Sequence, residues 1–345
     1  MKKAENRAMN STAQQDFSQV LQLIQQARQT LFAQANTALM ELYWHIGQTI
    51  SQKVRSASWG KGVVTELAHY IAQNAPDVKG FSDKNLWRMK QFYETYSGDE
   101  KLATLWRVLS WSHNRTIMTL KSQEAREFYL NLSIADRLSV RELERQIDSA
   151  QYERSAIGNP QLPALLRELH PTISNTFKDN YVLEFLGLPP VHSENSLQKA
   201  LVQHIKSFIL ELGKDFIFMG EEYRLQVGNQ DFHIDLLFFH RGLSALVAFE
   251  LKIGKFSPQH LGQINFYLEA LDRDVKKPHE NPSIGVLLCR DKDDEVVEYA
   301  LSRNMSPTLV AQYQLQLPDK KLIQAKLHEL LAQLPDDDES ARGEM

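Results

Sequence analysis

The chain has 345 residues, of which 43% are hydrophobic and 24% are charged, and it carries a formal net charge of −4 at pH 7. This composition is typical of a globular protein with two domains and excludes a disordered chain. One cysteine, Cys289, excludes an internal disulfide framework and predicts a buried thiol in a core strand. Neither an apolar leader nor a run of 18 apolar residues is found, which predicts a cytoplasmic protein without a membrane partner.

The charge is divided unevenly along the chain. Residues 1–155 contain 20 Lys and Arg against 16 Asp and Glu, a net +4, whereas the remainder contains 19 against 27, a net −8. The acidic run from Asp336 to Glu339 predicts a disordered tail over 335–345. The excess of cations in the first half favours that half as the source of contacts to nucleic-acid phosphates.

After a disordered segment over 1–15, the spacing of apolar residues predicts a helical domain over 16–155. Between residues 17 and 54 apolar residues recur at helical intervals, with no Pro or Gly before Gly47, so we expect one long helix or two. The apolar positions that define this stripe are Val20, Leu21, Ile24, Ala27, Leu31, Ala35, Leu39 and Leu42.

Two shorter helices follow, over 63–74 and from Ser82 onward, and Ser82 is a favourable N-cap. A glycine-containing turn joins them, and the second helix has a polar and cationic outer face. This arrangement is typical of a helix-turn-helix, in which Lys84, Asn85 and Arg88 would enter a DNA groove. An ordinary helical hairpin with a solvated face is the alternative.

Glycine and proline residues bracket a connecting segment over 156–190, and a second domain follows over 191–334. Its apolar patterns predict an α/β fold in which a helix precedes three strands, a second helix and a fourth strand. The expected elements are a helix at 195–212, strands at 222–228, 231–239 and 245–252, a helix at 258–271, a strand at 284–289, a helix at 293–302, a strand at 308–314 and a helix at 319–333.

Two neighbouring strands of this domain carry charged residues within otherwise apolar sequence. Asp235 lies on one strand, and Glu250 and Lys252 lie on the same face of the next. Burying such charges costs several kcal/mol unless they are paired or bind an ion. We therefore expect Asp235, Glu250 and the backbone carbonyl of Leu251 to bind Mg²⁺, with Mn²⁺ as a substitute, and Lys252 to activate water or stabilise charge. An ion pair at the end of the sheet is the alternative.

The Asp…Glu-x-Lys pattern is the signature of PD-(D/E)XK nucleases, and the surrounding sequence resembles the YhcG family of such nucleases. The resemblance is carried by DFHIDLLFFHRGLSALVAFELKIGKFSPQHLGQINFYLEALD and HENPSIGVLLCRDKDDEVVEYAL, and it extends upstream through LSVRELERQI and FKDNYVLEFLGL. It covers the chain from about Asp16 to about Leu317. It implies a restriction-endonuclease-like α/β fold for the C-terminal domain and an all-helical N-terminal domain that binds DNA or oligomerises.

The resemblance also implies further site residues. Relatives carry a metal-binding Glu on the helix before the sheet, at the position of Gln198 here, and Glu194 lies one turn earlier on the same face. Either residue would complete the metal site, or Glu194 only complements the helix N-terminus. Gln263 and Tyr267 resemble a Gln-x-x-x-Tyr element that positions phosphate or water, and Lys255 is a candidate phosphate contact. As alternatives, Tyr267 belongs to the core and Lys255 is a solvated turn residue.

These observations predict a Mg²⁺-dependent nuclease, with an endonuclease acting on branched or junction DNA as one form of the prediction. DNA is favoured over RNA because of the helix-turn-helix pattern and the resolvase-like Gln-x-x-x-Tyr element. A resolvase-like enzyme needs two active sites, which suggests a homodimer. The alternative, kept open by Gln198, is a catalytically impaired nuclease fold that binds nucleic acid or acts in an oligomeric assembly.

Overall fold

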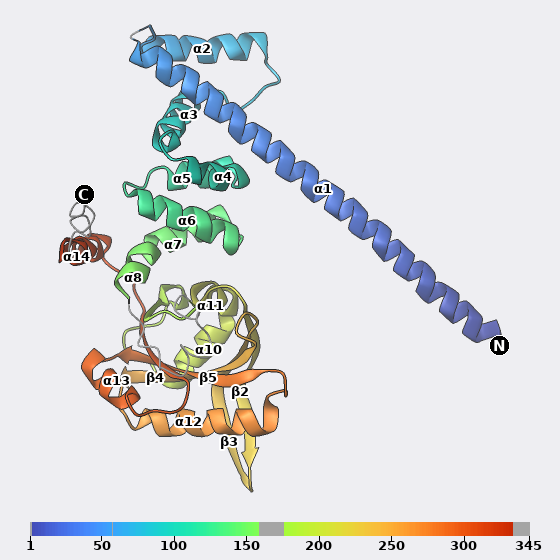
Figure 1. Cartoon of the computed structure of the whole chain (residues 1–345), viewed down its shortest axis with the longest axis vertical. Coiled ribbons are helices and arrows are strands. Elements are labelled where there is room, and N and C mark those ends of the chain that lie inside the picture. The colour runs from blue at the N-terminus through green and yellow to red at the C-terminus, as the bar shows by residue number, and fades with distance from the viewer. Residues whose placement is uncertain (1, 57, 159–175, 334–345) are drawn as a thin grey trace, which may run out of the picture. The chain divides into compact units, whose positions relative to one another are not determined.

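The computed structural model describes residues 2–56, 58–158 and 176–333, and the chain divides into two compact units between Glu144 and Arg145 (Figure 1). In the described residues the N-terminal unit is helical, and the C-terminal unit is built round a sheet. The expected acidic tail over 335–345 lies outside the described residues. Across the described helices, none combines the length and the hydropathy needed to cross a membrane.

The N-terminal unit begins with α1, a helix of 54 residues over Lys2–Arg55. This helix includes residues 2–15, where the sequence predicted disorder; the segment contains no proline or glycine that would interrupt a helix. The helices that follow are α2 (Lys61–Asn74), α3 (Asp83–Tyr96), α4 (Glu100–Val108), α5 (Trp111–Ile117), α6 (Gln123–Ala135) and α7 (Val140–Asp148), which spans the division between the units.

The side of α1 that enters the core is not the side marked by the apolar stripe of the sequence. Met40 is fully buried, and Gly47 packs against α3 so closely that a Cβ atom would lie 2.0 Å from the backbone oxygen of Met89. By contrast, Leu39 and Leu42 of the stripe remain 39% and 45% exposed. The helix therefore has two apolar sides, and the described part of its own unit covers only one of them.

Aromatic rings fill the space between α1, α3 and α4. Trp44 stacks on Trp106 with 5.1 Å between ring centroids, and Phe92 meets Trp106 edge-on at 5.0 Å. Pairs of this kind stabilise a core beyond the area that they bury, by about 0.5–1.5 kcal/mol each. The long helix is thus anchored near its C-terminal end by aromatic packing.

The connection between α2 and α3 bears on the predicted helix-turn-helix. Ser82 caps α3 as predicted, because its hydroxyl accepts a hydrogen bond from the backbone N–H of Asn85. The connection covers residues 75–82, which is longer than the turn of roughly 3–4 residues in a helix-turn-helix. This length fits the helical hairpin that the sequence left as the alternative.

The C-terminal unit contains a six-stranded sheet in the order β1-β6-β5-β4-β3-β2. The neighbours among β2, β3 and β4 are antiparallel, whereas β4, β5, β6 and β1 run parallel. The predicted α-β-β-β-α-β order is present as α10, β2, β3, β4, α12 and β5. The bounds are α8 (Gln151–Ile157), β1 (Asn180–Val182), η2 (Glu184–Leu186), α10 (Glu194–Gln203), α11 (Ile205–Leu212), β2 (Phe216–Val227), β3 (Gln230–His240), β4 (Ala245–Lys255), α12 (His260–Ala270), η3 (Leu271–Val275), β5 (Asn281–Asp291), α13 (Asp294–Leu301), β6 (Thr308–Gln314) and α14 (Lys320–Gln333).

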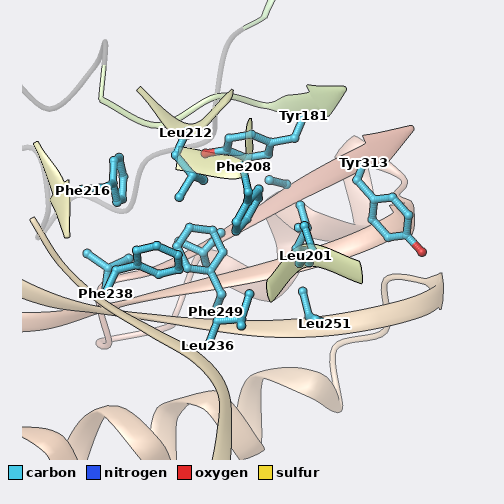
Figure 2. Close-up of a cluster of buried hydrophobic side chains, with 14 of the residues drawn as sticks. Tyr181, Leu201, Phe208, Leu212, Phe216, Leu236, Phe238, Phe249, Leu251 and Tyr313 are labelled. Atoms are coloured by element: carbon cyan, nitrogen blue, oxygen red, sulfur yellow. The ribbon is translucent and has the colours of Figure 1, made fainter. Parts of the chain in front are cut away.

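Helices cover both faces of this sheet, with α10 and α11 on one face and α12 and α13 on the other (Figure 1). On the first face, Phe238, Phe249 and Leu251 of the strands pack against Leu201 and Phe208 of the helices (Figure 2). A strand buried on both faces reads as a continuous apolar run, as β4 and β5 do. The charged residues of β4 are therefore exceptions in a buried layer.

The opposite face of the sheet carries the charged residues. Leu246 and Ala248 of β4 pack with Tyr267 of α12, so Glu250 and Lys252, two and four residues further along, share that face. α12 lies close to the neighbouring strand β5 at Gly285, where a Cβ would come within 2.8 Å of Ile264. The absent side chain at this glycine thus sets how near α12 lies to the strands that carry the charges.

Two segments differ from the predicted elements. Part of the predicted connecting segment, 156–190, belongs to the sheet, because β1 pairs in parallel with β6 through Tyr181 and Tyr313. The predicted helix over 195–212 is divided at His204, which leaves helical geometry with a φ of −108° and a ψ of 30°. Cys289 is buried in β5, as its apolar neighbours predicted.

Candidate functional site

The candidate site lies where β3 and β4 stop pairing. Their ladder runs from His240 and Ala245 to Leu236 and Phe249, and the next opposed positions are Asp235 and Glu250. At this point Oδ2 of Asp235 accepts a hydrogen bond of 2.7 Å from the backbone N–H of Leu251. The side chain of Asp235 therefore takes the place of a main-chain ladder bond and is fixed against β4.

Glu250 and Lys252 form the second part of the site. Lys252 Nζ lies 2.9 Å from Glu250 Oε1, and the glutamate is only 3% exposed. The other carboxylate oxygen, Oε2, is buried and has no hydrogen-bond partner in the described part of the chain. A buried carboxylate oxygen without a partner is costly, so this atom marks a position that favours a cation or a donor.

The electrostatics of the site follow from burial and from the pairing of like charges. Burial and the charge of Asp235 raise the pKa of Glu250 to about 7, against the pull of Lys252. Burial also raises the pKa of Asp235, opposed mainly by the hydrogen bond from Leu251. Burial by itself lowers the pKa of Lys252, but its hydrogen bond to Glu250 and the surrounding carboxylates together raise that pKa above its ordinary value. The site thus holds two carboxylates that resist ionising together and a lysine that stays charged.

Both helix residues named from the sequence reach this site. Oε2 of Glu194, in the first turn of α10, lies 3.9 Å from Lys252 Nζ. Gln198 is 7% exposed, and its Nε2 donates a 3.0 Å hydrogen bond to the backbone oxygen of Asp235. Gln198 therefore holds the main chain of β3 beside the site, and Glu194 supplies a third carboxylate to the field around Lys252.

The Gln263 and Tyr267 pair is formed as the spacing predicted. Gln263 Nε2 donates to the Tyr267 hydroxyl at 2.9 Å, and the tyrosine is 5% exposed. Burial raises the pKa of Tyr267, and the charges of Glu250 and Asp235 raise it further. The phenol is thus within the field of the two carboxylates, and it remains protonated at neutral pH.

Two residues near the site carried no sequence signal. His260, at the start of α12, accepts a hydrogen bond of 3.2 Å at Nδ1 from the backbone N–H of Ser257, which leaves the proton on Nε2. Burial and the charge of Lys252 lower the pKa of His260. Glu222 on β2 has a φ of 45°, and its charge adds to the rise in the pKa of Asp235. Neither residue belongs to a sequence motif. Strand pairing brings Glu222 near the site, and the turn before α12 brings His260 near it.

The remaining predicted contacts lie elsewhere. Lys255, at the end of β4, is 57% exposed in its side chain and lies 3.7 Å from Asp293 Oδ2. In the N-terminal unit Lys84 is exposed, whereas the amide of Asn85 donates to the backbone oxygen of Gly80 and accepts from the indole of Trp111. Asn85 therefore stabilises its own domain with both ends of its side chain, which leaves less of it for a groove contact than the sequence suggested.

The oxygen ligands of the site are few. Within the described ranges no three His, Cys, Asp or Glu side chains come together closely enough to hold an ion. Mg²⁺ characteristically takes only one or two carboxylates and keeps several waters. Asp235 and Glu250, with the free Oε2 of the latter, satisfy that smaller requirement. The residues present therefore fit a hydrated divalent cation rather than a closed protein cage.

Comparisons with known proteins identify a family for each half of the chain. Residues 174–328 match the family model described as "YhcG PDDEXK nuclease domain", and residues 19–154 match the "DUF1016 N-terminal domain". The chain is 32% identical over 351 residues to a protein of Escherichia coli (strain K12) named "Putative nuclease YhcG". The alignment covers 91% of this chain and 93% of that protein.

Solved structures give partial likenesses to the chain. A repair endonuclease from Pyrococcus abyssi matches at 12% identity and a TM-score of 0.25, over 37% of this chain and 49% of that one. An "EndoMS-dsDNA2 complex" matches at 14% identity and a TM-score of 0.26, over 39% and 47%. The chain thus spans about half the length of each, and at these values neither carries an argument about activity. The extent of the sequence match and the diverging strands with their Asp…Glu-x-Lys residues together place this chain in the YhcG family, with a C-terminal PD-(D/E)XK nuclease domain of the restriction-endonuclease-like fold.

Proposed function

We propose that this chain is a Mg²⁺-dependent nuclease that hydrolyses phosphodiester bonds in DNA, including branched DNA, with Mn²⁺ as a substitute ion. The observation that carries the proposal is the half-buried Asp235 and the buried Glu250 beside Lys252, with one oxygen of Glu250 left without a hydrogen-bond partner among the described residues. A buried ion pair stabilises a fold only where its remaining lone pairs are also satisfied, and Oε2 of Glu250 is not satisfied by the described residues.

Asp235, Glu250 and the backbone carbonyl of Leu251 would hold the ion, which when bound supplies Lewis acidity and positive charge at the scissile phosphate. Lys252 keeps its proton at neutral pH, because its pKa is raised. It therefore acts as a donor to negative charge that develops on the phosphate, and not as the base that takes a proton from water.

The α12 residues act on the substrate as donors. Gln263 donates to the oxygen of Tyr267, so the hydroxyl proton of this phenol is directed to another acceptor. His260, with its proton on Nε2, is a second neutral donor near Lys252. We propose that these two groups orient the phosphate and the attacking water, because positioned donors are the main resource of phosphoryl-transfer catalysts.

The helical domain over 16–155 is proposed to hold the DNA. Residues 1–155 carry a net charge of +4, whereas the remainder carries −8, and an excess of cations is what phosphate binding requires. Lys84 and Arg88 on α3 are the proposed contacts there, and Lys255 is the proposed contact beside the site. The preference for DNA over RNA rests on this domain and on the Gln263 and Tyr267 pair.

Cleavage of a substrate panel tests the proposal. Linear duplex, single strand, four-way junction and RNA are incubated with Mg²⁺ or with EDTA, using the wild type, Lys252→Ala and Lys321→Ala. Lys321 is an exposed lysine of α14 and is the matched loss of one charge. We expect Mg²⁺-dependent cutting of DNA by the wild type and Lys321→Ala, and none by Lys252→Ala. Cutting of RNA alone would overturn the choice of DNA.

A second function is favoured by one observation. Gln198 stands where relatives carry a metal-binding Glu, and it donates to the main chain instead of offering a charged oxygen. A weakened ion site would leave a nucleic-acid-binding protein. Titration calorimetry separates the two: Mg²⁺ binding supports the nuclease, whereas DNA affinity without Mg²⁺ binding supports the binding protein.

A further inference from the structure

A second apolar side of α1, which the described part of its own unit leaves uncovered, has the properties of an association surface. Between Phe17 and Ala35 every residue of α1 is exposed, so this stretch makes no core contact with the described part of its own unit. Eight large apolar side chains nevertheless recur along it and into the packed part of the helix. We name them the α1 stripe: Phe17, Val20, Leu21, Ile24, Leu31, Phe32, Leu39 and Leu42.

The α1 stripe occupies one side of the helix. At about 100° per residue its members fall within a sector of about 120°, the width of a helix face that is built to be buried. Met40 and Gly47, which face α3, lie on a different side. Leu39 and Leu42 belong to the stripe, and they stay exposed even where α1 is packed. The stripe is therefore a surface separate from the core contact of α1.

Exposure of this size is unusual for a helix without a partner. Phe17, Leu31 and Phe32 are 71%, 65% and 68% exposed, and the other five members are between 39% and 55% exposed. With on the order of 100 Å² of exposed area for each side chain, the stripe offers about 800 Å², which matches one side of a standard protein interface. Soluble proteins rarely leave a contiguous apolar patch of that size open to water.

The charge of this segment identifies the class of partner. Residues 17–42 contain only Arg28 and Glu41 as charged groups, and Glu41 already pairs with Arg107 at 3.2 Å. A nucleic acid or an anionic membrane would require a row of lysines and arginines beside the stripe, which is absent from this segment. Beside the paired Glu41, only Arg28 of each copy brings a charge to a contact between two such helices, so repulsion between the copies is small.

The polar residues beside the stripe also fit a second copy. Gln25 and Gln34 lie at its two edges, and an amide both donates and accepts hydrogen bonds. Such a border is complementary to itself, as a two-fold symmetric interface demands. Arg28 lies within the stripe, and its long aliphatic stem can lie along apolar neighbours while its guanidinium reaches the edge. We propose that the α1 stripe joins two copies of this chain into a homodimer.

Sedimentation equilibrium of the full-length protein tests this proposal. The variant Ile24→Glu with Leu31→Glu places two charges in the stripe, about two helical turns apart. Its matched control is Gln22→Glu with Gln29→Glu, which adds the same two charges at the same separation on another side of the exposed helix. We expect the wild type and the control to be dimers in both 0.15 M and 1 M NaCl, because burial of apolar surface does not weaken with salt. The stripe variant should dissociate with a Kd raised by about 100-fold or more.

Three results would overturn the dimer proposal: a monomeric wild type, a stripe variant that associates like the wild type, or a control that dissociates like the stripe variant. Loss of folding is monitored separately, since all five tryptophans precede residue 112 and report on the N-terminal unit. The substituted side chains are exposed, so we expect the tryptophan emission of all three proteins to agree. The test does not depend on nuclease activity.

Discussion

Replacing Glu250 by glutamine is expected to stabilise the metal-free protein at alkaline pH. The folded-state pKa of Glu250 is about 7, against 4.5 for the free side chain, because the carboxylate is buried beside Asp235. A group whose pKa is raised by folding contributes stability at low pH and loses it as the pH rises through the folded value. The ionised glutamate therefore weakens the fold above pH 7, and a neutral glutamine of the same shape removes that penalty.

The magnitude follows from the shift. A rise of about 2.5 pKa units corresponds to roughly 3 kcal/mol at 1.36 kcal/mol per unit, and this is an upper limit. The glutamine also forms a weaker hydrogen bond with Lys252 than the 2.9 Å charged contact, so we expect a net gain of about 1–3 kcal/mol at pH 8.5. At roughly 2–4 °C per kcal/mol, the unfolding transition of the C-terminal unit should rise by several degrees.

Differential scanning calorimetry of the full chain in EDTA at pH 5.5 and pH 8.5 measures this gain. Tryptophan emission serves as an internal reference, because Trp44, Trp59, Trp87, Trp106 and Trp111 all lie in the N-terminal unit and should not respond. Millimolar Mg²⁺ should stabilise the wild type and leave Glu250→Gln unaffected. The reasoning would be refuted if the variant melted at or below the wild-type temperature at pH 8.5, or if its gain were the same at both pH values.

Three further substitutions test other parts of the structure. Gly47→Ala should destabilise the N-terminal unit by about 2–3 kcal/mol or more, because the added Cβ would lie 2.0 Å from a backbone oxygen of α3. Tryptophan emission during urea unfolding measures this loss of stability. An unchanged unfolding midpoint would contradict the close packing of α1 on α3. Glu211→Gln should cost about 3–5 kcal/mol, since this fully buried carboxylate pairs with Arg145 at 3.1 Å and Arg154 at 3.2 Å; calorimetry that shows no loss would exclude the ion network as a stabilising element. Gln198→Glu should tighten Mn²⁺ binding several-fold in calorimetric titration, because it adds a negative charge. It should also lower the melting temperature in EDTA, because it removes the 3.0 Å hydrogen bond to the main chain. Weaker Mn²⁺ binding would place this side chain outside the ion site.

The sequence by itself determined most local elements of this protein and which residues make up its candidate site. Apolar runs predicted β3 and β4 with Asp235, Glu250 and Lys252 on them, and Ser82 predicted the start of α3. These features depend on residues close together in the chain, since backbone periodicity and capping act over a few positions. The Gln263 and Tyr267 bond was foreseeable for the same reason.

Only the tertiary structure decided how these pieces meet. Asp235 reaches the backbone of Leu251 because the β3–β4 ladder ends at Leu236, which leaves Asp235 outside it. No local sequence pattern predicts where such a ladder ends. His260 joins the site through the packing of α12 at Gly285. Apolar spacing predicted that α1 is a helix, but packing on α3 decided which side is buried, because Gly47 allows the two helices to approach there. Hydrophobic periodicity identifies an apolar face of a helix. Which segment covers that face depends on shape complementarity between segments far apart in the chain.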